Sequence, residues 1–236
     1  MDAVNVELTT AAQDSNQSTA LPATQRVKLT EIFFSIQGEA DAVGWPTVFI
    51  RLTGCPLRCG YCDTTYSFYG GEWFANSTVL DKVKEHGVKH VCVTGGEPLA
   101  QQGCIPLLKS LCDAGYEVSL ETSGAIDIAA VDSRVSRVMD LKTPGSGELA
   151  RNRYENISWL TSHDQLKFVL CDRADYEWAR DQVVQRQLDK RCMVLFSPVH
   201  GQVAPRDLAE WILKDKLPVR MQLQLHKILW GEERGR

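Results

Sequence analysis

Short apolar runs alternate with amphipathic stretches along the chain from about residue 27 onward. The runs are rich in β-branched and aromatic residues, and their length and composition are typical of β-strands. Because helical patterns separate several of them, the sequence predicts parallel strands in an α/β fold. The predicted strands cover residues 47–52, 90–94, 117–121, 137–141, 165–170, 193–196 and 219–225.

Helical spacing of apolar residues is clear in three of the intervening stretches. Asp172, followed by Asp175, is suited to cap and charge the start of one helix. Residues 126–135 and 146–160 show the helical pattern only weakly, so we expect irregular crossovers there. The apolar positions that predict helices are Leu108, Leu111 and Cys112; Tyr176, Ala179 and Val183; and Leu208, Trp211 and Ile212.

The first 25 residues differ in character from the rest of the chain. Residues 1–25 are rich in Ala, Thr, Gln, Asn, Ser and Asp and show no periodicity. Such a segment buries too little apolar surface to offset its ordering entropy, so we expect a disordered leader. The chain has 236 residues and no Pro/Gly/Ser-rich linker, which predicts a single domain over residues 26–236.

Composition excludes several classes of protein. Hydrophobic residues make up 44% and charged residues 24%, which is typical of a globular protein. No apolar run reaches the roughly 18 residues of a membrane span, and the N-terminus lacks a signal-peptide pattern, so we expect a cytoplasmic protein without a membrane partner. The net charge is −4 and the basic residues are scattered, so we expect no nucleic-acid partner.

Polar residues recur where the predicted strands end. The successive junctions read Gly-Cys, Thr-Gly-Gly-Glu, Glu-Thr-Ser-Gly, Asp-Leu-Lys-Thr and Ser-Pro. In parallel α/β folds the carboxyl ends of the strands surround the active site. One polar junction would be an ordinary loop, but five in succession favour an enzyme with one central pocket.

Three of the eight cysteines crowd into one segment directly after a predicted strand. Cys55, Cys59 and Cys62 have the spacing C-x3-C-x2-C. Thiolates suit zinc or iron–sulfur clusters. A structural zinc site needs a fourth ligand, which His86 or His90 could supply. A four-iron cluster held by three thiolates keeps one iron open to a small molecule.

The other cysteines lie singly in apolar stretches, where we expect small, buried, reduced side chains. A redox disulfide within the C-x3-C-x2-C segment would use two of its cysteines and leave the third unexplained. The single cysteines are Cys92, Cys104, Cys112, Cys171 and Cys192.

The cysteine segment resembles the signature of radical S-adenosylmethionine (SAM) enzymes, with Tyr61 as the aromatic residue before the last cysteine. The stretch Thr94–Pro98 resembles the Gly-Gly-Glu motif of these enzymes, which contacts the methionine amino group of SAM. The two glycines permit close backbone approach to a ligand. The resemblance implies a partial (β/α)6 barrel with some reduced crossovers, a 4Fe–4S cluster on Cys55, Cys59 and Cys62, and SAM as the radical source.

Six segments occur in the order Ser35–Glu39, Phe49–Cys55, Cys62–Thr64, Thr94–Pro98, Glu121–Gly124 and Gln224–Lys227. Together they closely resemble the 7-carboxy-7-deazaguanine synthase family, over residues 29–229. The resemblance implies a lyase that converts 6-carboxy-5,6,7,8-tetrahydropterin to 7-carboxy-7-deazaguanine with loss of ammonia, in queuosine biosynthesis. It also implies a homodimer reduced by flavodoxin or ferredoxin.

This resemblance implies a role for each matching position, and none of them is a catalytic acid or base because the cofactor supplies the radical. SAM is expected at Tyr61, Cys62, Asp63, Gly95, Gly96, Glu97, Asp140, Leu141 and Lys142. The pterin is expected at Ile36, Gln37, Gly38, Arg51, Thr94, Glu121 and His226. Thr64 is expected to bind a Mg²⁺ ion that also holds the substrate carboxylate.

Residue chemistry leaves an alternative open at several of these positions. Arg51 offers a rigid fork for a carboxylate, but it could instead form an ion pair on its strand. Gln37 could read a pterin edge or lie at the surface. Glu121 could accept from pterin nitrogens or end a turn. For His226 the sequence alone favours a core histidine on a strand.

Two other functions also stay open. A radical SAM activase would use the same cluster to form a glycyl radical on a partner protein. A zinc-stabilised binding module would have no catalytic activity.

Overall fold

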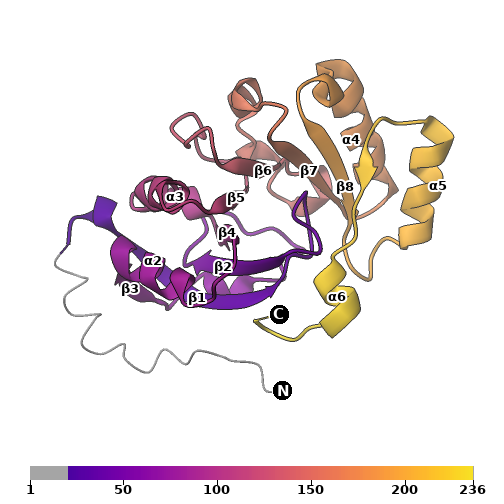
Figure 1. The fold of residues 1–236 in the computed structure, drawn as a ribbon. Helices are drawn as coiled ribbons and strands as arrows, with labels where there is room; N and C mark the ends of the chain where they lie inside the picture. The colour runs from indigo at the N-terminus through magenta and orange to yellow at the C-terminus, as the bar shows by residue number, and fades with distance from the viewer. Residues whose placement is uncertain (1–20, 236) are drawn as a thin grey trace.

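The computed structural model describes residues 21–235, which form a curved sheet with helices outside it (Figure 1). Of the predicted leader, residues 1–20 lie outside the described residues. Its last part is ordered, because Ala23–Gln25 form a 3-10 turn that leads directly into the first strand.

The described residues form one nine-stranded sheet in the order β3-β1-β2-β4-β5-β6-β7-β8-β9. Neighbouring strands from β2 to β9 are parallel, whereas β1 pairs antiparallel with both β2 and β3. The end strands β3 and β9 do not pair with each other, so the barrel is open, as the resemblance implies. The strands are β1 (Arg26–Ile36), β2 (Pro46–Leu52), β3 (Glu72–Ala75), β4 (His90–Gly95), β5 (Glu117–Thr122), β6 (Ser136–Asp140), β7 (Gln165–Leu170), β8 (Met193–Pro198) and β9 (Arg220–Met221).

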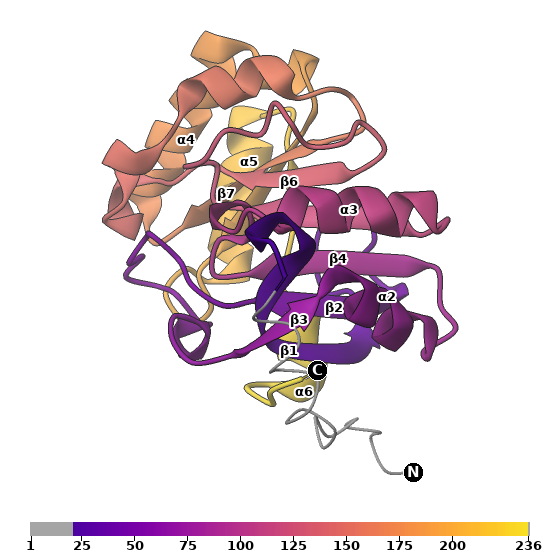
Figure 2. The same cartoon turned by 90° about the vertical axis from the view of Figure 1, so that its left-hand side faces the viewer.

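The helices α2 to α5 cover the outside of the sheet, and α2 and α3 lie in front of β4 in the second view (Figure 2). The side chain of Asp172 caps α4 by accepting a hydrogen bond from the backbone of Asp175, as the sequence predicts. The crossover before β6 contains no helix and the crossover after β6 carries only 3-10 helices, which agrees with the weak helical patterns there. The helices are α2 (Asn76–Lys84), α3 (Cys104–Asp113), α4 (Arg173–Arg186), α5 (Pro205–Asp215) and α6 (Leu225–Trp230).

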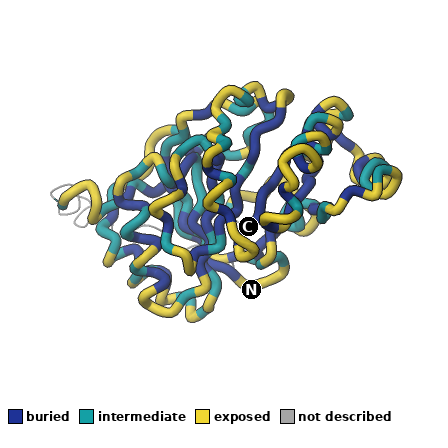
Figure 3. Tube along the Cα trace, turned by 90° about the horizontal axis from the view of Figure 1, so that it is seen from above, coloured by how far each residue is buried: buried dark blue, intermediate teal, exposed yellow. Residues whose placement is uncertain are grey.

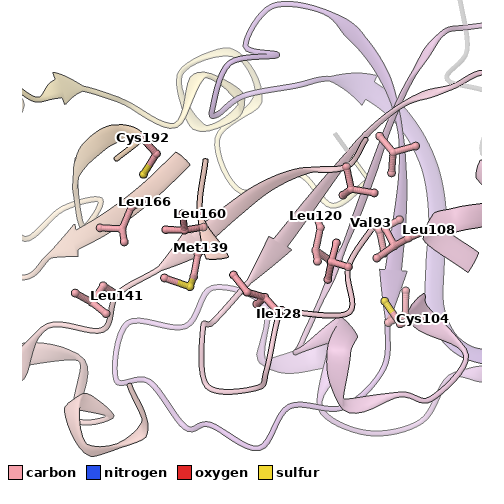
Figure 4. Close-up of a cluster of buried hydrophobic side chains, with 14 of the residues drawn as sticks. Val93, Cys104, Leu108, Leu120, Ile128, Met139, Leu141, Leu160, Leu166 and Cys192 are labelled. Atoms are coloured by element: carbon pink, nitrogen blue, oxygen red, sulfur yellow. The ribbon is translucent and has the colours of Figure 1, made fainter. Parts of the chain in front are cut away.

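Many residues of the strands are buried (Figure 3), and alternate residues along a strand have different surroundings. On β7, Leu166 and Phe168 belong to the main hydrophobic core, whereas Lys167 faces the other side of the sheet. Figure 4 shows part of this core, where Leu120, Met139 and Leu166 come from β5, β6 and β7. Strand residues that face away from this core can therefore be polar and can carry functional groups.

Two strands at the start of the sheet are absent from the sequence prediction. The edge strand β3 has four residues, and β1 continues to Ile36 with mixed polar and apolar residues. Pairing with β2, rather than a simple apolar pattern, therefore defines β1.

Two other sequence predictions are wrong. The predicted strand at 219–225 is reduced to Arg220–Met221, because the side chains of Gln222 and Gln224 turn to the loop after β1. Cys171 is only half-buried, because it follows the last residue of β7. The other four single cysteines are buried as expected.

Candidate functional site

A cavity of about 470 Å³ opens at the carboxyl ends of the parallel strands. Most of the residues predicted to bind ligands border it, although they come from widely separated segments. The predicted residues that line it are Ile36, Gln37, Gly38, Arg51, Cys55, Cys59, Tyr61, Cys62, Asp63, Thr64, Thr94, Gly95, Gly96, Glu121, Asp140, Lys142 and His226.

The three clustered thiols form one part of the cavity wall, in the loop after β2. Cys55, Cys59 and Cys62 are free and half-buried. Burial raises the pKa of each thiol above its ordinary value. The backbone N–H of Leu57 donates to Sγ of Cys55 over 3.4 Å, and such bonds are one means of tuning iron–sulfur clusters.

The glycines after β4 pack directly on this loop. The backbone N–H of Gly96 donates to the carbonyl oxygen of Leu52, and that of Glu97 donates to the carbonyl oxygen of Gly54. A β-carbon on Gly96 would lie 2.8 Å from Cβ of Cys55. Only glycine permits this approach, so the Gly-Gly segment and the cysteine loop form one rigid unit.

Two residues predicted to contact SAM do not border the cavity. The buried carboxylate of Glu97 accepts hydrogen bonds from the backbone N–H of Leu99 and from both the backbone and the side chain of Ser123. Its acceptor capacity is thus used within the protein. Leu141 is buried, and its backbone N–H donates to the carbonyl oxygen of Lys167.

The end of β6 supplies a buried ion pair beside the aromatic residue of the cysteine loop. Nζ of Lys142 lies 2.7 Å from Oδ2 of Asp140 and 5.7 Å from the ring centre of Tyr61. Although burial opposes charge on both groups, their attraction raises the pKa of Lys142 and lowers that of Asp140. Both remain charged at neutral pH.

Arg51 lies between aromatic rings on another part of the wall. Its Nε donates to Oε1 of Glu31 over 2.6 Å, and the hydroxyl of Tyr66 donates to the same oxygen. The Phe33 and Phe49 rings stack with centres 4.8 Å apart beside it. The strand ion pair considered from the sequence is therefore present, and the guanidinium still borders the cavity.

A second charge network on the cavity wall surrounds the buried ammonium of Lys167. Nζ of Lys167 is 2.9 Å from Glu39 Oε2, 3.2 Å from Glu121 Oε2 and 3.4 Å from Asp140 Oδ1. Burial raises the pKa of Glu121 to about 7, and the neighbouring carboxylates add to this effect while Lys167 opposes it. Glu121 lies within β5, so the alternative of a turn carboxylate is wrong.

His226 lies on α6 and not on a strand, which corrects the alternative drawn from the sequence. Burial lowers the pKa of His226 below its ordinary value, so the imidazole is neutral at pH 7. Gln37 is buried and not a surface loop residue.

Thr64 and Asp63 meet at the cavity edge. The hydroxyl of Thr64 donates to Oδ1 of Asp63 over 2.8 Å. Among residues 21–235, no group of three or more His, Cys, Asp or Glu side chains is arranged to hold a single metal ion.

Sequence reasoning missed several residues of the cavity. Glu39 stands next to the assigned Ile36–Gly38 segment, and Lys167 interrupts an apolar strand. An isolated charge in an apolar strand is a usable signal, because it must find a partner on one face. The missed residues used below are Phe33, Glu39, Phe49, Lys167 and Gln224.

Known proteins similar to this chain identify its family. The sequence pattern of the Radical SAM superfamily matches residues 49–141. A 7-carboxy-7-deazaguanine synthase of Chlorobaculum tepidum is 42% identical over 88% of this chain and 96% of its own length. The chain belongs to the 7-carboxy-7-deazaguanine synthase family. A second member, from Koribacter versatilis, is 41% identical over 88% of this chain and 98% of its own length.

A solved member of the fold supports the architecture of this family member. The crystal structure of QueE from Escherichia coli covers 85% of this chain and 95% of its own, with a TM-score of 0.69 and 22% sequence identity. The α/β fold with an open, mostly parallel sheet is thereby confirmed.

Membership of this family implies an enzyme with a 4Fe–4S cluster and SAM. The residues fit both groups. Three free thiols face one cavity, and glycine backbone and a buried Asp–Lys pair lie next to them. In the part of the chain that the structure describes, no helix has the length and apolar character needed to cross a membrane.

Proposed function

We propose that this chain is a radical SAM 7-carboxy-7-deazaguanine synthase, a carbon–nitrogen lyase that acts on 6-carboxy-5,6,7,8-tetrahydropterin. One observation carries the proposal: the three thiols share a single cavity with Arg51 and Glu121. A cluster site and a site for a small acid with a nitrogen-rich ring are therefore adjacent. We propose residues 26–236 as one catalytic domain.

The assigned residues divide into two groups around this cavity. Cys55, Cys59 and Cys62 would hold the cluster, and the SAM contacts fall to Tyr61, Asp63, Gly95, Gly96, Asp140 and Lys142, with the backbone of Cys62. When bound, the cluster and SAM supply a radical that can take a hydrogen atom from the pterin. The protein itself positions the reactants and excludes water.

The pterin-binding side follows from charge and shape. Arg51 offers its guanidinium to the substrate carboxylate. The Phe33 and Phe49 rings border the same space and present flat apolar surface. Glu121 accepts from the ring nitrogens, and neutral His226 can donate or accept one hydrogen bond. Ile36, Gln37, Gly38 and Thr94 complete this side.

We also propose Mg²⁺ at Thr64, a homodimer, flavodoxin or ferredoxin as electron donor, and a cytoplasmic location. The carboxylate of Asp63 beside the Thr64 hydroxyl supports the metal proposal, because Mg²⁺ prefers carboxylate oxygens. The other three rest on the family resemblance alone.

Two alternatives are less well supported. The curated relatives are synthases and not activases. The radical SAM sequence pattern covers all three clustered cysteines, which favours an iron–sulfur cluster over a zinc site.

Anaerobic reconstitution with iron and sulfide tests the proposal. We expect a brown protein that, with SAM, a reductant and 6-carboxytetrahydropterin, releases 7-carboxy-7-deazaguanine, detected by mass spectrometry. Cys59→Ala should lose iron and activity, whereas Cys112→Ala, on the helix α3, should retain both. Turnover of the pterin by Cys59→Ala, or no product from the brown wild-type protein, would contradict the proposal.

A further inference from the structure

Lys167 is a buried lysine that no function assigned above uses. Its side chain is 9% exposed, and its ammonium contacts carboxylates from three different segments. Glu39 comes from the loop after β1, Glu121 from β5, and Asp140 from the adjacent strand β6. Asp140 is also its register partner in the sheet.

The three carboxylates do not depend equally on this ammonium. Glu39 accepts further hydrogen bonds from the side-chain amides of Gln222 and Gln224. Asp140 is paired with Lys142 over 2.7 Å. Glu121 has only the Lys167 ammonium as its hydrogen-bond and ion-pair partner among the interactions found in the described residues. Removing the Lys167 ammonium would therefore affect Glu121 more than the other two carboxylates, because Glu121 would be left without a partner.

Glu121 also lies at the junction of the two halves of the cavity. Asp140 stands with the residues assigned to SAM, whereas Glu39 adjoins the segment assigned to the pterin. A buried carboxylate without a partner takes up a proton, and it then loses one of its acceptor oxygens. The burial-raised pKa of Glu121 is consistent with a carboxylate that depends on a nearby cation.

We infer that Lys167 is a positioning residue for the substrate: its ammonium favours the ionised form of Glu121 and directs that carboxylate toward the nitrogen-bearing edge of the pterin. The inference rests on the proposed function, because it names the pterin as the group that Glu121 receives. Lys167 itself need not touch substrate, since its ammonium already donates hydrogen bonds to Glu39 and Glu121 and forms an ion pair with Asp140.

Another buried ion pair on the sheet provides a control for the possibility that Lys167 has a purely structural role. Arg137 and Asp164 form a buried ion pair at 2.6 Å, with side chains 7% and 0% exposed. Neither residue borders the cavity. Arg137→Met is therefore a matched control that removes a buried cation without altering the proposed site.

The test is pterin binding to the reconstituted enzyme, measured anaerobically by calorimetry without reductant, so that no turnover occurs. Loss of one charge-assisted hydrogen bond predicts about 10- to 100-fold weaker binding for Lys167→Met. Lys167→Arg keeps the charge and should bind within about threefold of wild type. Arg137→Met should also bind within about threefold, although it unfolds at a lower temperature.

A double-mutant cycle then asks whether Lys167 acts through Glu121. In a Glu121→Gln background, adding Lys167→Met should change the affinity by less than about threefold. If Lys167→Met alone does not fold, this double variant, which removes one charge of each sign, still permits the comparison with Glu121→Gln.

The outcomes separate the inference from the proposed function. If the wild-type protein binds no pterin, the proposed function fails. If it binds pterin and Lys167→Met binds equally well, the inference is overturned. A further large loss in the Glu121→Gln background would also overturn it, because Lys167 would then act independently of Glu121.

Discussion

Gly38 lies directly against His226: a β-carbon at position 38 would overlap the imidazole Nδ1 and lie 3.0 Å from the backbone nitrogen of His226. The carbonyl oxygen of Gly38 also accepts a hydrogen bond from the backbone N–H of Leu225 over 3.1 Å. These contacts join the loop after β1 to the start of α6. Two segments from opposite ends of the described chain thus form one wall of the cavity.

The first prediction concerns this contact. Gly38→Ala should displace His226 and weaken pterin binding by about tenfold, a loss comparable to one hydrogen bond. The cluster content, measured by iron analysis, should stay unchanged because the cysteine loop is separate. Gly60→Ala is the control, since a β-carbon there meets nothing within 4 Å. Equal affinities for the two variants would show that the packing of Gly38 does not matter.

The second prediction concerns Arg51 and the ion pair that orients it. Lysine lacks the planar fork, so Arg51→Lys should weaken binding of the carboxylated pterin by about tenfold or more. Binding of the same pterin without its 6-carboxylate should change by less than about twofold. Glu31→Gln should show the same pattern with a smaller loss, because the guanidinium is then less well oriented. Affinity measurements with both ligands decide this, and equal losses for the two ligands would argue against carboxylate recognition.

The third prediction assigns Glu97 a structural role. The carboxylate accepts hydrogen bonds from Leu99, Thr122 and Ser123, so Glu97→Gln should lower the free energy of unfolding by about 1–3 kcal/mol. Denaturant unfolding measures this loss. SAM binding to the folded fraction should persist with a modest loss. Abolished SAM binding in a variant of full stability would instead return Glu97 to direct ligand contact.

The fourth prediction concerns pH. The pKa of Glu121 is raised to about 7 by burial and by Glu39 and Asp140, against the opposing charge of Lys167. If the ionised carboxylate accepts from the pterin, affinity should rise about tenfold from pH 6 to pH 8. The lowered pKa of His226 keeps that group neutral over most of this range.

Glu121→Gln is the control for this prediction, and its affinity should be nearly independent of pH. The raised pKa of Glu121 also affects the free energy of unfolding. The stabilising contribution of protonated Glu121 is present at low pH and is lost as the pH rises through about 7. An unchanged pH profile in Glu121→Gln would assign the titration to another group.

Particular elements show how far local sequence carries the fold. Local sequence predicts the cap of α4 and most of the parallel strands, because burial and capping each require characteristic residues at neighbouring positions. The strands predicted in this way are β2, β4, β5, β6, β7 and β8. The strand β1 is not, since its mixed pattern becomes a strand only through pairing with β2 and β3. The predicted strand at 219–225 fails because Gln222 and Gln224 find partners on a loop far away in sequence.

The site divides in the same way. The cysteine spacing, the Gly-Gly turn and the polar ends of the strands are local features, so the sequence by itself determined the cysteine loop, the family, and the 4Fe–4S cluster and SAM that the family implies. The tertiary structure alone decided that Glu97 faces inward, that Arg51 is held by Glu31, and that Lys167 gathers three carboxylates. The physical reason is that desolvation and ion pairing depend on groups that folding brings together. These groups lie far apart along the chain, so the local composition around each one does not show that they will meet.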